Sequence, residues 1–257
     1  MARVTFALVK FDYRELPDGE CTFGQHDGRA SSKSAGVFLW SFQRRLHIAL
    51  KCRDAAVAAA LVREASARRT MLVEENRERI VDRASESHLW LCAAVTAAYH
   101  VLRSHPTTRD AALSVVRGAF LSTGAKGVGK TMRLLPKLVR DPFRFTINVS
   151  KKKQSAYYGR TFEHVVVQDD NDAYRMTVSK CFYHRFLIDH GAAELGPTFC
   201  EKDLDWAAAI DPVTHGFSFS RPTTLLTTGE PCRFEFRRTR QTRSSVIDTG
   251  RPGDPGQ

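Results

Sequence analysis

The side chains best suited to chemistry gather in the last part of the chain, which holds Cys181, Cys200 and Cys232, three of its six cysteines. Thiols and carboxylates are groups that act as nucleophiles and proton carriers in enzymes. In "FCEKDLDW", Cys200 and Asp203 are three positions apart, so one helical turn directs both side chains the same way. In "CRFEFRR", strand alternation places Cys232 on one face with two phenylalanines, and Arg221 ends the strand before it.

The segment "AYRMTVSKCFYHRF" has the two-residue period of a strand, which divides its side chains between two faces. One face is apolar, and the other carries Arg175, Thr177, Ser179 and Cys181. The pattern therefore predicts a polar neighbourhood for Cys181.

A second candidate site is the stretch "GAFLSTGAKGVGKTMRLLPKLV", in which Gly124, Gly129, Lys130 and Thr131 match the phosphate-binding pattern G-x-x-x-x-G-K-T. Such a loop needs a buried strand before it and an unbroken helix after it. Here the preceding segment has helical periodicity, and Pro136 would break or kink the following helix. The segment "HVVVQDD" could imitate a strand that ends at a magnesium-binding carboxylate, but no βαβ series surrounds it. We therefore predict a Gly-rich connection between helices and no nucleotide site.

The elements that must position these residues change type along the chain. Apolar periodicity predicts three helices in succession within 54–69, 78–104 and the segment that follows Thr108, a suitable N-cap. After Pro142, three segments rich in β-branched and aromatic residues predict strands: "FRFTINVS", "FEHVVVQ" and "AYRMTVSKCFYHRF". "GFSFSR" and "TTLLTT" lead through Gly229-Glu230-Pro231 into "CRFEFRR", which predicts a hairpin.

Helices followed by strands predict an α+β fold, with a helical layer packed on an antiparallel sheet that ends in a C-terminal β-hairpin. We expect residues 1–75 to form an N-terminal extension of unknown role. Residues 76–238 would be the α+β domain, and the polar, Gly- and Pro-rich segment 239–257 a disordered tail.

Composition narrows the class of protein. The chain of 257 residues carries 39 Lys and Arg against 28 Asp and Glu, but its basic runs lack interleaved aromatic residues, so we expect solvated surfaces and not nucleic-acid binding. The longest apolar run, 89–102, is too short to span a bilayer, and the N-terminus has no leader pattern. These features predict a cytoplasmic protein with reduced cysteines.

A series of features follows in a fixed order through residues 180–238. They are a cysteine before an aromatic-rich helix (Cys181), a Gly-x-x-Glu-Leu segment (Gly191, Glu194, Leu195), Cys-x-x-Asp (Cys200, Asp203), an apolar strand ending in arginine (Phe217, Phe219, Arg221), a threonine (Thr224) and Gly-x-x-Cys-x-Phe (Gly229, Cys232, Phe234). In this order the set resembles the C-terminal half of the L-2-amino-thiazoline-4-carboxylic acid hydrolase family. The helices from about residue 78 onward could extend the resemblance.

The resemblance implies a hydrolase that opens the ring of a cyclic isothiourea acid, a thiazoline-like carboxylic acid, at a C–N or C–S bond. Water adds at the carbon between nitrogen and sulfur and leaves a carbamoyl-cysteine. In that reaction Cys181 or Cys200 would be the nucleophile, and Asp203 or His184 the proton carrier. Three thiolates with Asp203 or His184 could instead hold Zn²⁺ and activate water, although the spacings are not those of a C-x-x-C site.

Substrate binding is assigned by the same resemblance. Arg221 would clamp the substrate carboxylate. The other residues expected to line the pocket are Thr224, Cys232 and Thr177. For the site to form, the strand before Cys181 must lie beside the terminal hairpin, with the Cys200 to Asp203 turn at the same end.

Two other functions fit the same pocket. Many members of this family look like tailoring enzymes of natural-product biosynthesis, so one alternative is an isomerase or cyclase. The other is a protein that binds a small molecule or metal without turning it over.

Overall fold

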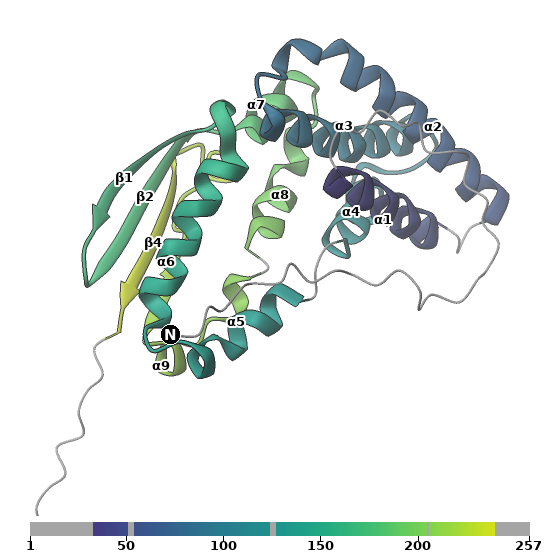
Figure 1. Cartoon of the computed structure of the whole chain (residues 1–257). Helices are drawn as coiled ribbons and strands as arrows, with labels where there is room; N and C mark the ends of the chain where they lie inside the picture. The colour runs from purple at the N-terminus through teal and green to yellow at the C-terminus, as the bar shows by residue number, and fades with distance from the viewer. Residues whose placement is uncertain (1–32, 51–53, 124–126, 205, 240–257) are drawn as a thin grey trace, which may run out of the picture.

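The computed structural model describes residues 33–50, 54–123, 127–204 and 206–239, and the descriptions below refer to these residues. Figure 1 shows a group of helices at one end of the molecule and a sheet at the other. The α-helices are α1 (Lys33–Leu50), α2 (Ala55–Glu75), α3 (Arg83–Ser104), α4 (Arg109–Leu121), α5 (Gly127–Leu138), α6 (Pro142–Lys153), α7 (Phe182–Asp189), α8 (Gly196–Asp203) and α9 (Pro212–His215). Short turns of 3-10 helix are η1 (Arg77–Arg79), η3 (Gly159–Thr161), η4 (Ala193–Leu195) and η5 (Ala207–Ala209), and η2 (Gln154–Tyr158) is a π-helix.

The three successive helices predicted from the sequence are confirmed as α2, α3 and α4, and each begins at a capping side chain. The carboxylate of Asp54 accepts from the amides of Ala56 and Val57, and Thr108 accepts from the amide of Ala111. Asp82 and Ser85 form a capping box at the start of α3. Because these caps satisfy amides that have no partner inside the helix, they fix where each helix starts.

The helical layer includes the part of segment 33–75 that the structure describes. Phe42 and Leu46 of α1 and Leu72 of α2 are buried in the same hydrophobic cluster as residues of α3 and α4. Phe42 packs edge-on against Phe120, with ring centroids 6.5 Å apart. The described part of the predicted N-terminal extension therefore shares its core with the rest of the chain.

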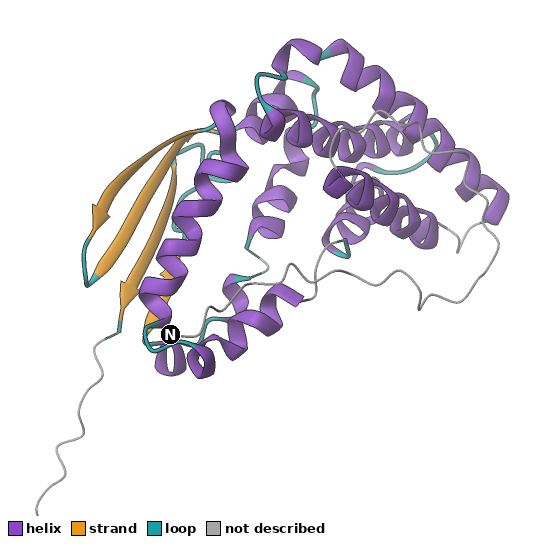
Figure 2. Cartoon of the chain, in the orientation of Figure 1, coloured by secondary structure: helices purple, strands orange, loops and turns teal. Residues whose placement is uncertain are grey.

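The sheet has four antiparallel strands in the order β1-β2-β4-β3, as an α+β fold requires (Figure 2). The strands are β1 (Glu163–Asp169), β2 (Ala173–Lys180), β3 (Phe217–Ser220) and β4 (Cys232–Arg238). Tyr174, Met176 and Val178 of β2 are buried, whereas Arg175 and Thr177 are partly exposed. The alternation predicted for β2 is therefore confirmed, and one face of the sheet packs on the helices.

The strand predicted for "FRFTINVS" is wrong, because this segment belongs to helix α6. Asp141 caps the helix through the amide of Arg144, and Pro142 occupies its first turn. Phe143 and Ile147, one helical turn apart, are fully buried, and the Phe143 ring packs on Phe217 of the sheet. A capped start and a buried helical stripe therefore outweigh the strand preference of the β-branched residues.

The C-terminal hairpin is confirmed as β3 and β4, but "TTLLTT" is not part of a strand. It forms hydrogen-bonded turns, in which the Thr228 amide donates to the Thr224 carbonyl. Of the predicted tail, Thr239 is hydrogen-bonded to Gly216 and Pro212, and 240–257 lie outside the described residues.

Gly129, Lys130 and Thr131 of the phosphate-loop pattern belong to helix α5, so this part of the predicted Gly-rich connection is helical. Gly124 lies outside the described residues, and α5 begins at Gly127, before Lys130. Helix α5 continues past Pro136 to Leu138, so the expected break at the proline does not occur. Among the described helices, none combines the length and apolar character needed to cross a membrane.

Candidate functional site

The pairing of β2 with β4 brings two of the predicted site cysteines to one end of the sheet. Val178 is the partner of Cys232 in this pairing, and Cys181 follows one residue after β2 ends. At Cys181 the chain leaves the strand and begins α7, so its side chain no longer follows the alternation of β2. Cys181 is buried, and the polar groups near it come from other elements of the fold instead of its own strand face.

Helix α8 brings Cys200 and Asp203 to the same place, and Arg221 joins them from the end of β3. The guanidinium of Arg221 donates through Nη1 to Asp203 Oδ2 at 3.0 Å and through Nη2 to the Cys200 carbonyl at 2.6 Å. Only 6% of the Arg221 side chain is exposed, against 37% for Asp203. The guanidinium also lies over the ring of Phe234, 5.4 Å from its centroid. These contacts fix the cation between α8 and the sheet.

These residues line a small, partly open cavity of about 40 Å³. Its polar lining comes from Cys181, Cys200, Cys232, Asp203, Arg221 and three tyrosines, Tyr157, Tyr158 and Tyr183. The remaining lining side chains are apolar: Phe162, Val178, Phe199, Leu225, Leu226 and Phe234. The predicted convergence of the three cysteines with Asp203 and Arg221 is therefore present in the structure.

The thiols of this cavity are held in their protonated form. Burial raises the pKa of Cys181 to about 12, while the amides of His184 and Tyr183 at the start of α7 act in the opposite direction. Burial also raises the pKa of Cys200, against the opposing effects of the Arg221 charge and the Thr224 hydroxyl. A thiol that is neutral at physiological pH needs a proton acceptor when it attacks.

Cys232 and Thr224 are tied together by the connection between β3 and β4. The amide of Leu225 donates to the Cys232 sulfur at 3.4 Å, and burial raises the pKa of this thiol. Thr224 is buried and bonded to the hydroxyl of Thr227 at 2.6 Å. Through its contact with Cys200, Thr224 lies beside the cavity.

His184 and Thr177 do not belong to the set of described residues that line the cavity. Thr177 lies between Val165 and Arg233 on the sheet face opposite to Val178, which does line the cavity. His184 is partly exposed on α7, whereas its neighbours Phe182 and Tyr183 are buried. The side chains of both residues therefore lie outside the group formed by the other sequence candidates, although the His184 amide contacts Cys181.

The zinc alternative does not fit the side chains present. Within the described parts of the chain, no three His, Cys, Asp or Glu side chains are arranged to hold a metal ion. The four cysteines in these parts, Cys92, Cys181, Cys200 and Cys232, are free thiols.

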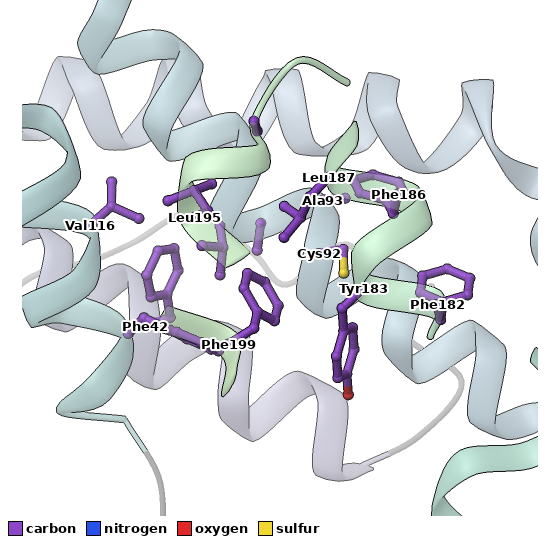
Figure 3. Packing of buried hydrophobic residues seen from close by; sticks show 14 of the residues in the cluster. Phe42, Cys92, Ala93, Val116, Phe182, Tyr183, Phe186, Leu187, Leu195 and Phe199 are labelled. Atoms are coloured by element: carbon purple, nitrogen blue, oxygen red, sulfur yellow. The ribbon is translucent and has the colours of Figure 1, made fainter. Parts of the chain in front are cut away.

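A hydrogen-bonded chain that sequence reasoning missed reaches the cavity from α3. His88 Nδ1 lies 2.8 Å from the Tyr183 hydroxyl, and the Tyr183 hydroxyl lies 2.8 Å from that of Tyr157. His88 Nε2 lies 2.6 Å from the carbonyl oxygen of Tyr157. Figure 3 shows Tyr183 among the buried apolar side chains, with its hydroxyl directed away from Cys92 and Phe186. Because a buried histidine must find partners, its place on an otherwise apolar helix was the available signal.

The donors and acceptors of this chain have one consistent order. Burial lowers the pKa of His88, so the imidazole is neutral and carries one proton. A carbonyl oxygen only accepts, which places that proton on Nε2 and leaves Nδ1 to accept from Tyr183. The single hydrogen of the Tyr183 hydroxyl is then used, so Tyr157 donates to Tyr183. The Tyr157 oxygen, which donates its hydrogen to Tyr183, has lone pairs that can accept.

The segment that carries Tyr157 is also attached to the start of α3. The amide of Arg160 donates to Asp82 Oδ2 at 2.6 Å. Gly159 has a φ of +58°, and a Cβ there would lie 2.5 Å from the same oxygen. This position therefore requires glycine, both for its backbone conformation and for its close approach to Asp82.

A larger cavity of about 440 Å³ lies on the other side of Tyr157. Phe38 and Leu39 of α1 form one wall, and α3 contributes residues that include Arg83, Ser87 and His88. Tyr157 lines both cavities, and its side chain is 48% exposed. His88 and Tyr157 thus separate the outer cavity from the inner one.

Comparison with known proteins gives one match. The family model of L-2-amino-thiazoline-4-carboxylic acid hydrolase matches residues 88–236, more than half of the chain. No curated protein and no solved structure matches the chain significantly. The matched range begins at His88 and includes every residue named above as lining the inner cavity. The chain belongs to the L-2-amino-thiazoline-4-carboxylic acid hydrolase family.

Proposed function

We propose that this protein is a hydrolase that opens the ring of a small thiazoline-like carboxylic acid by breaking its C–S bond. The observation that carries the proposal is the Arg221 to Asp203 ion pair beside three thiols in one small cavity. The family supplies the reaction class. The identity of the heterocyclic substrate is part of what we propose.

The charges of the cavity suit a zwitterionic substrate. An aminothiazoline acid carries a carboxylate and, when its ring nitrogen is protonated, an amidinium cation. Arg221 uses two of its five N–H groups on Asp203 and Cys200, and others can donate to a carboxylate. Asp203 can pair with the amidinium. A substrate of this kind would therefore satisfy both members of the ion pair.

The inner cavity must enlarge to admit such a substrate. Its volume of about 40 Å³ is close to that occupied by a single water molecule. Tyr157, half-exposed and bordering the outer cavity, is the lining side chain through which the two cavities can join. Closure behind the substrate would exclude bulk water and strengthen the charge interactions.

The reaction proceeds in two displacements at the amidinium carbon. A cavity thiol, Cys181 or Cys200, attacks this carbon, and the C=N electron pair moves to nitrogen. The ring C–S bond then breaks, and its sulfur takes the electron pair and the proton that the thiol lost. Water attacks the same carbon and displaces the enzyme thiol. The oxygen of water remains in the carbamoyl group of the product.

The proposal is tested by incubating the purified protein with 2-aminothiazoline-4-carboxylate in ¹⁸O-labelled water. We expect one labelled oxygen in a carbamoyl-cysteine product, measured by mass spectrometry together with one new free thiol. An isomer formed without label would instead identify an isomerase or cyclase. A ligand retained unchanged through many protein equivalents would identify a binding protein.

Matched variants locate the activity within the fold. Whichever of Cys181→Ala and Cys200→Ala removes the attacking thiol should lower kcat by about 100-fold or more while the protein stays folded, and Asp203→Asn should lower kcat as well. Thr177→Ala and His184→Ala change predicted site residues that lie outside the cavity lining, so both should keep kcat within about threefold. Full turnover by folded Cys181→Ala and Cys200→Ala proteins would overturn the proposal.

A further inference from the structure

We propose that His88 is the base of the reaction and that it receives the proton of the attacking Cys181 thiol through the hydroxyls of Tyr157 and Tyr183. This inference rests on the hydrolase proposed above. It replaces Asp203 and His184, the candidates from the sequence, as proton carriers. It takes Cys181 as the nucleophile, because this thiol lines the inner cavity and lies at the start of the helix that carries Tyr183.

The chain is continuous from the inner cavity to His88. Tyr157 and Tyr183 both line the cavity beside Cys181, and each step from Tyr157 to His88 is a hydrogen bond of 2.8 Å. Cys181 is the residue directly before α7, the helix that carries Tyr183. Burial raises the pKa of the Tyr183 hydroxyl well above its usual value, so this tyrosine is neutral at rest.

The order of donors gives the chain a direction. As Cys181 attacks, its proton passes to the Tyr157 oxygen, directly or through a water molecule in the cavity. The Tyr157 proton moves to Tyr183, and the Tyr183 proton moves to His88 Nδ1. When the ring C–S bond breaks, the same hops in reverse return one proton to the leaving sulfur. Each tyrosine gains one proton as it loses another, so both are neutral before and after the transfer and no tyrosinate ion accumulates.

The surroundings of His88 can stabilise the imidazolium for the lifetime of the intermediate. Its Nε2–H already donates to the Tyr157 carbonyl, and the carboxylate of Asp82 on the same helix favours the charged form. Neutral Tyr157 and Tyr183 face the ring from η2 and α7. Arg83 lines the outer cavity together with His88 and is exposed.

The first test compares variants that remove the base or interrupt the chain. His88→Gln can donate to the Tyr157 carbonyl but cannot take up a proton, and Tyr183→Phe removes the middle step. Both should lower kcat by about 100-fold and leave KM within about threefold. Folding is checked by circular dichroism and melting temperature.

Two controls make equivalent changes elsewhere. His215 is a buried histidine whose Nε2 bonds to the Met132 carbonyl at 2.9 Å, and Tyr174 is a buried tyrosine that donates to Gln154 at 3.0 Å. His215→Gln and Tyr174→Phe should therefore keep kcat within about threefold.

The second test uses chemical rescue. His88→Ala removes a side chain from the wall of the outer cavity, through which added imidazole can reach the vacated position. Rates should rise with imidazole concentration and, across substituted imidazoles, with the basicity of the ring. In Tyr183→Phe the base is still present, so imidazole should restore nothing.

The outcomes separate the two proposals. If wild-type protein hydrolyses no thiazoline acid, both fall. If wild-type protein is active and folded His88→Gln and Tyr183→Phe keep kcat within about threefold, the hydrolase stands and the proton chain falls. Rescue that is independent of the basicity of the added imidazole would also overturn the chain, because it would show that His88 only fills space.

Discussion

Arg221 and Asp203, from different elements of the fold, form an ion pair of 3.0 Å in which the cation is buried and the carboxylate reaches the surface. The same guanidinium donates to the carbonyl of Cys200. One side chain therefore fixes the end of α8 against the sheet and defines the charge of the cavity. Both the stability of the protein and its proposed activity therefore depend on this ion pair.

Replacement of Arg221 by lysine should be costly, although the charge is kept. A lysine ammonium cannot reproduce the fork that contacts Asp203 and the Cys200 carbonyl together. We expect a loss of about 1 to 3 kcal/mol in the free energy of unfolding, measured by urea denaturation, and a higher KM. As a control, Arg117→Lys changes the exposed ion pair between Arg117 of α4 and Glu201 of α8. This variant should lose less than about 0.5 kcal/mol in the free energy of unfolding.

Cys181 should resist alkylation at neutral pH and become reactive only in strong base. Burial raises its pKa from 9.0 to about 12, so at pH 8 about one thiol in ten thousand is ionised. Iodoacetamide followed by peptide mass spectrometry should label Cys200, which is less buried, before Cys181. Rapid labelling of Cys181 at pH 7 in folded protein would contradict this expectation.

The same shift makes stability fall with pH in the alkaline range. Between pH 9 and about 12 the folded protein keeps the Cys181 proton that the unfolded chain releases. The folded state thus binds more protons, and the free energy of unfolding decreases as pH rises through this window. Denaturation of Cys181→Ala should show a shallower decrease than wild type over that range.

Asp141→Asn should test how α6 is held on the sheet. Arg238 of β4 bonds to both oxygens of Asp141, and this contact is the first cause that lowers the carboxyl pKa below 3.8. The ionised Asp141 carboxylate stabilises the folded state above pH 3.8, and this stabilisation is lost as the pH falls below the carboxyl pKa of the folded protein. Because the side chain is partly exposed, we expect a cost of about 1 kcal/mol or less at pH 7. At pH 2 variant and wild type should converge.

Lys130→Ala should leave thiazoline hydrolysis unchanged, and neither protein should bind ATP with magnesium. The expectation follows from helix α4, which occupies the place where a phosphate loop needs a buried strand. Isothermal titration of both proteins with ATP and Mg²⁺ checks it. Tight binding that disappears in the variant would show that the sequence pattern is a working site.

The sequence predicts the meeting of Cys181 and Cys232 because strand pairing converts alternating patterns into neighbours. Once β2 lies beside β4, the residues at the end of each strand must be close. Cys200 and Asp203 were predictable for a similar reason, since one helical turn sets their direction. The ion pair of Asp203 with Arg221 could not be predicted in this way, because it depends on how α8 packs against the end of β3.

Other features depend on tertiary contacts that local patterns do not contain. His88 meets Tyr157 and Tyr183 across 69 and 95 positions of the chain, and no spacing rule connects them. Helix α6 was predicted as a strand because its β-branched residues outweighed its cap and proline. The polar neighbours of Cys181 were assigned to its own strand face, because the pattern could not show that the strand ends one residue earlier and that these neighbours come from other elements.

The attachment of segment 154–160 to α3 has a consequence for the history of this chain. Asp82 holds one end through Arg160 and Gly159, and His88 holds the other through Tyr157. A change at any of these positions removes the reason for the others. In related sequences we therefore expect Asp82, His88, Tyr157 and Gly159 to be inherited or lost together, as a single unit, even where the cysteines of the cavity vary.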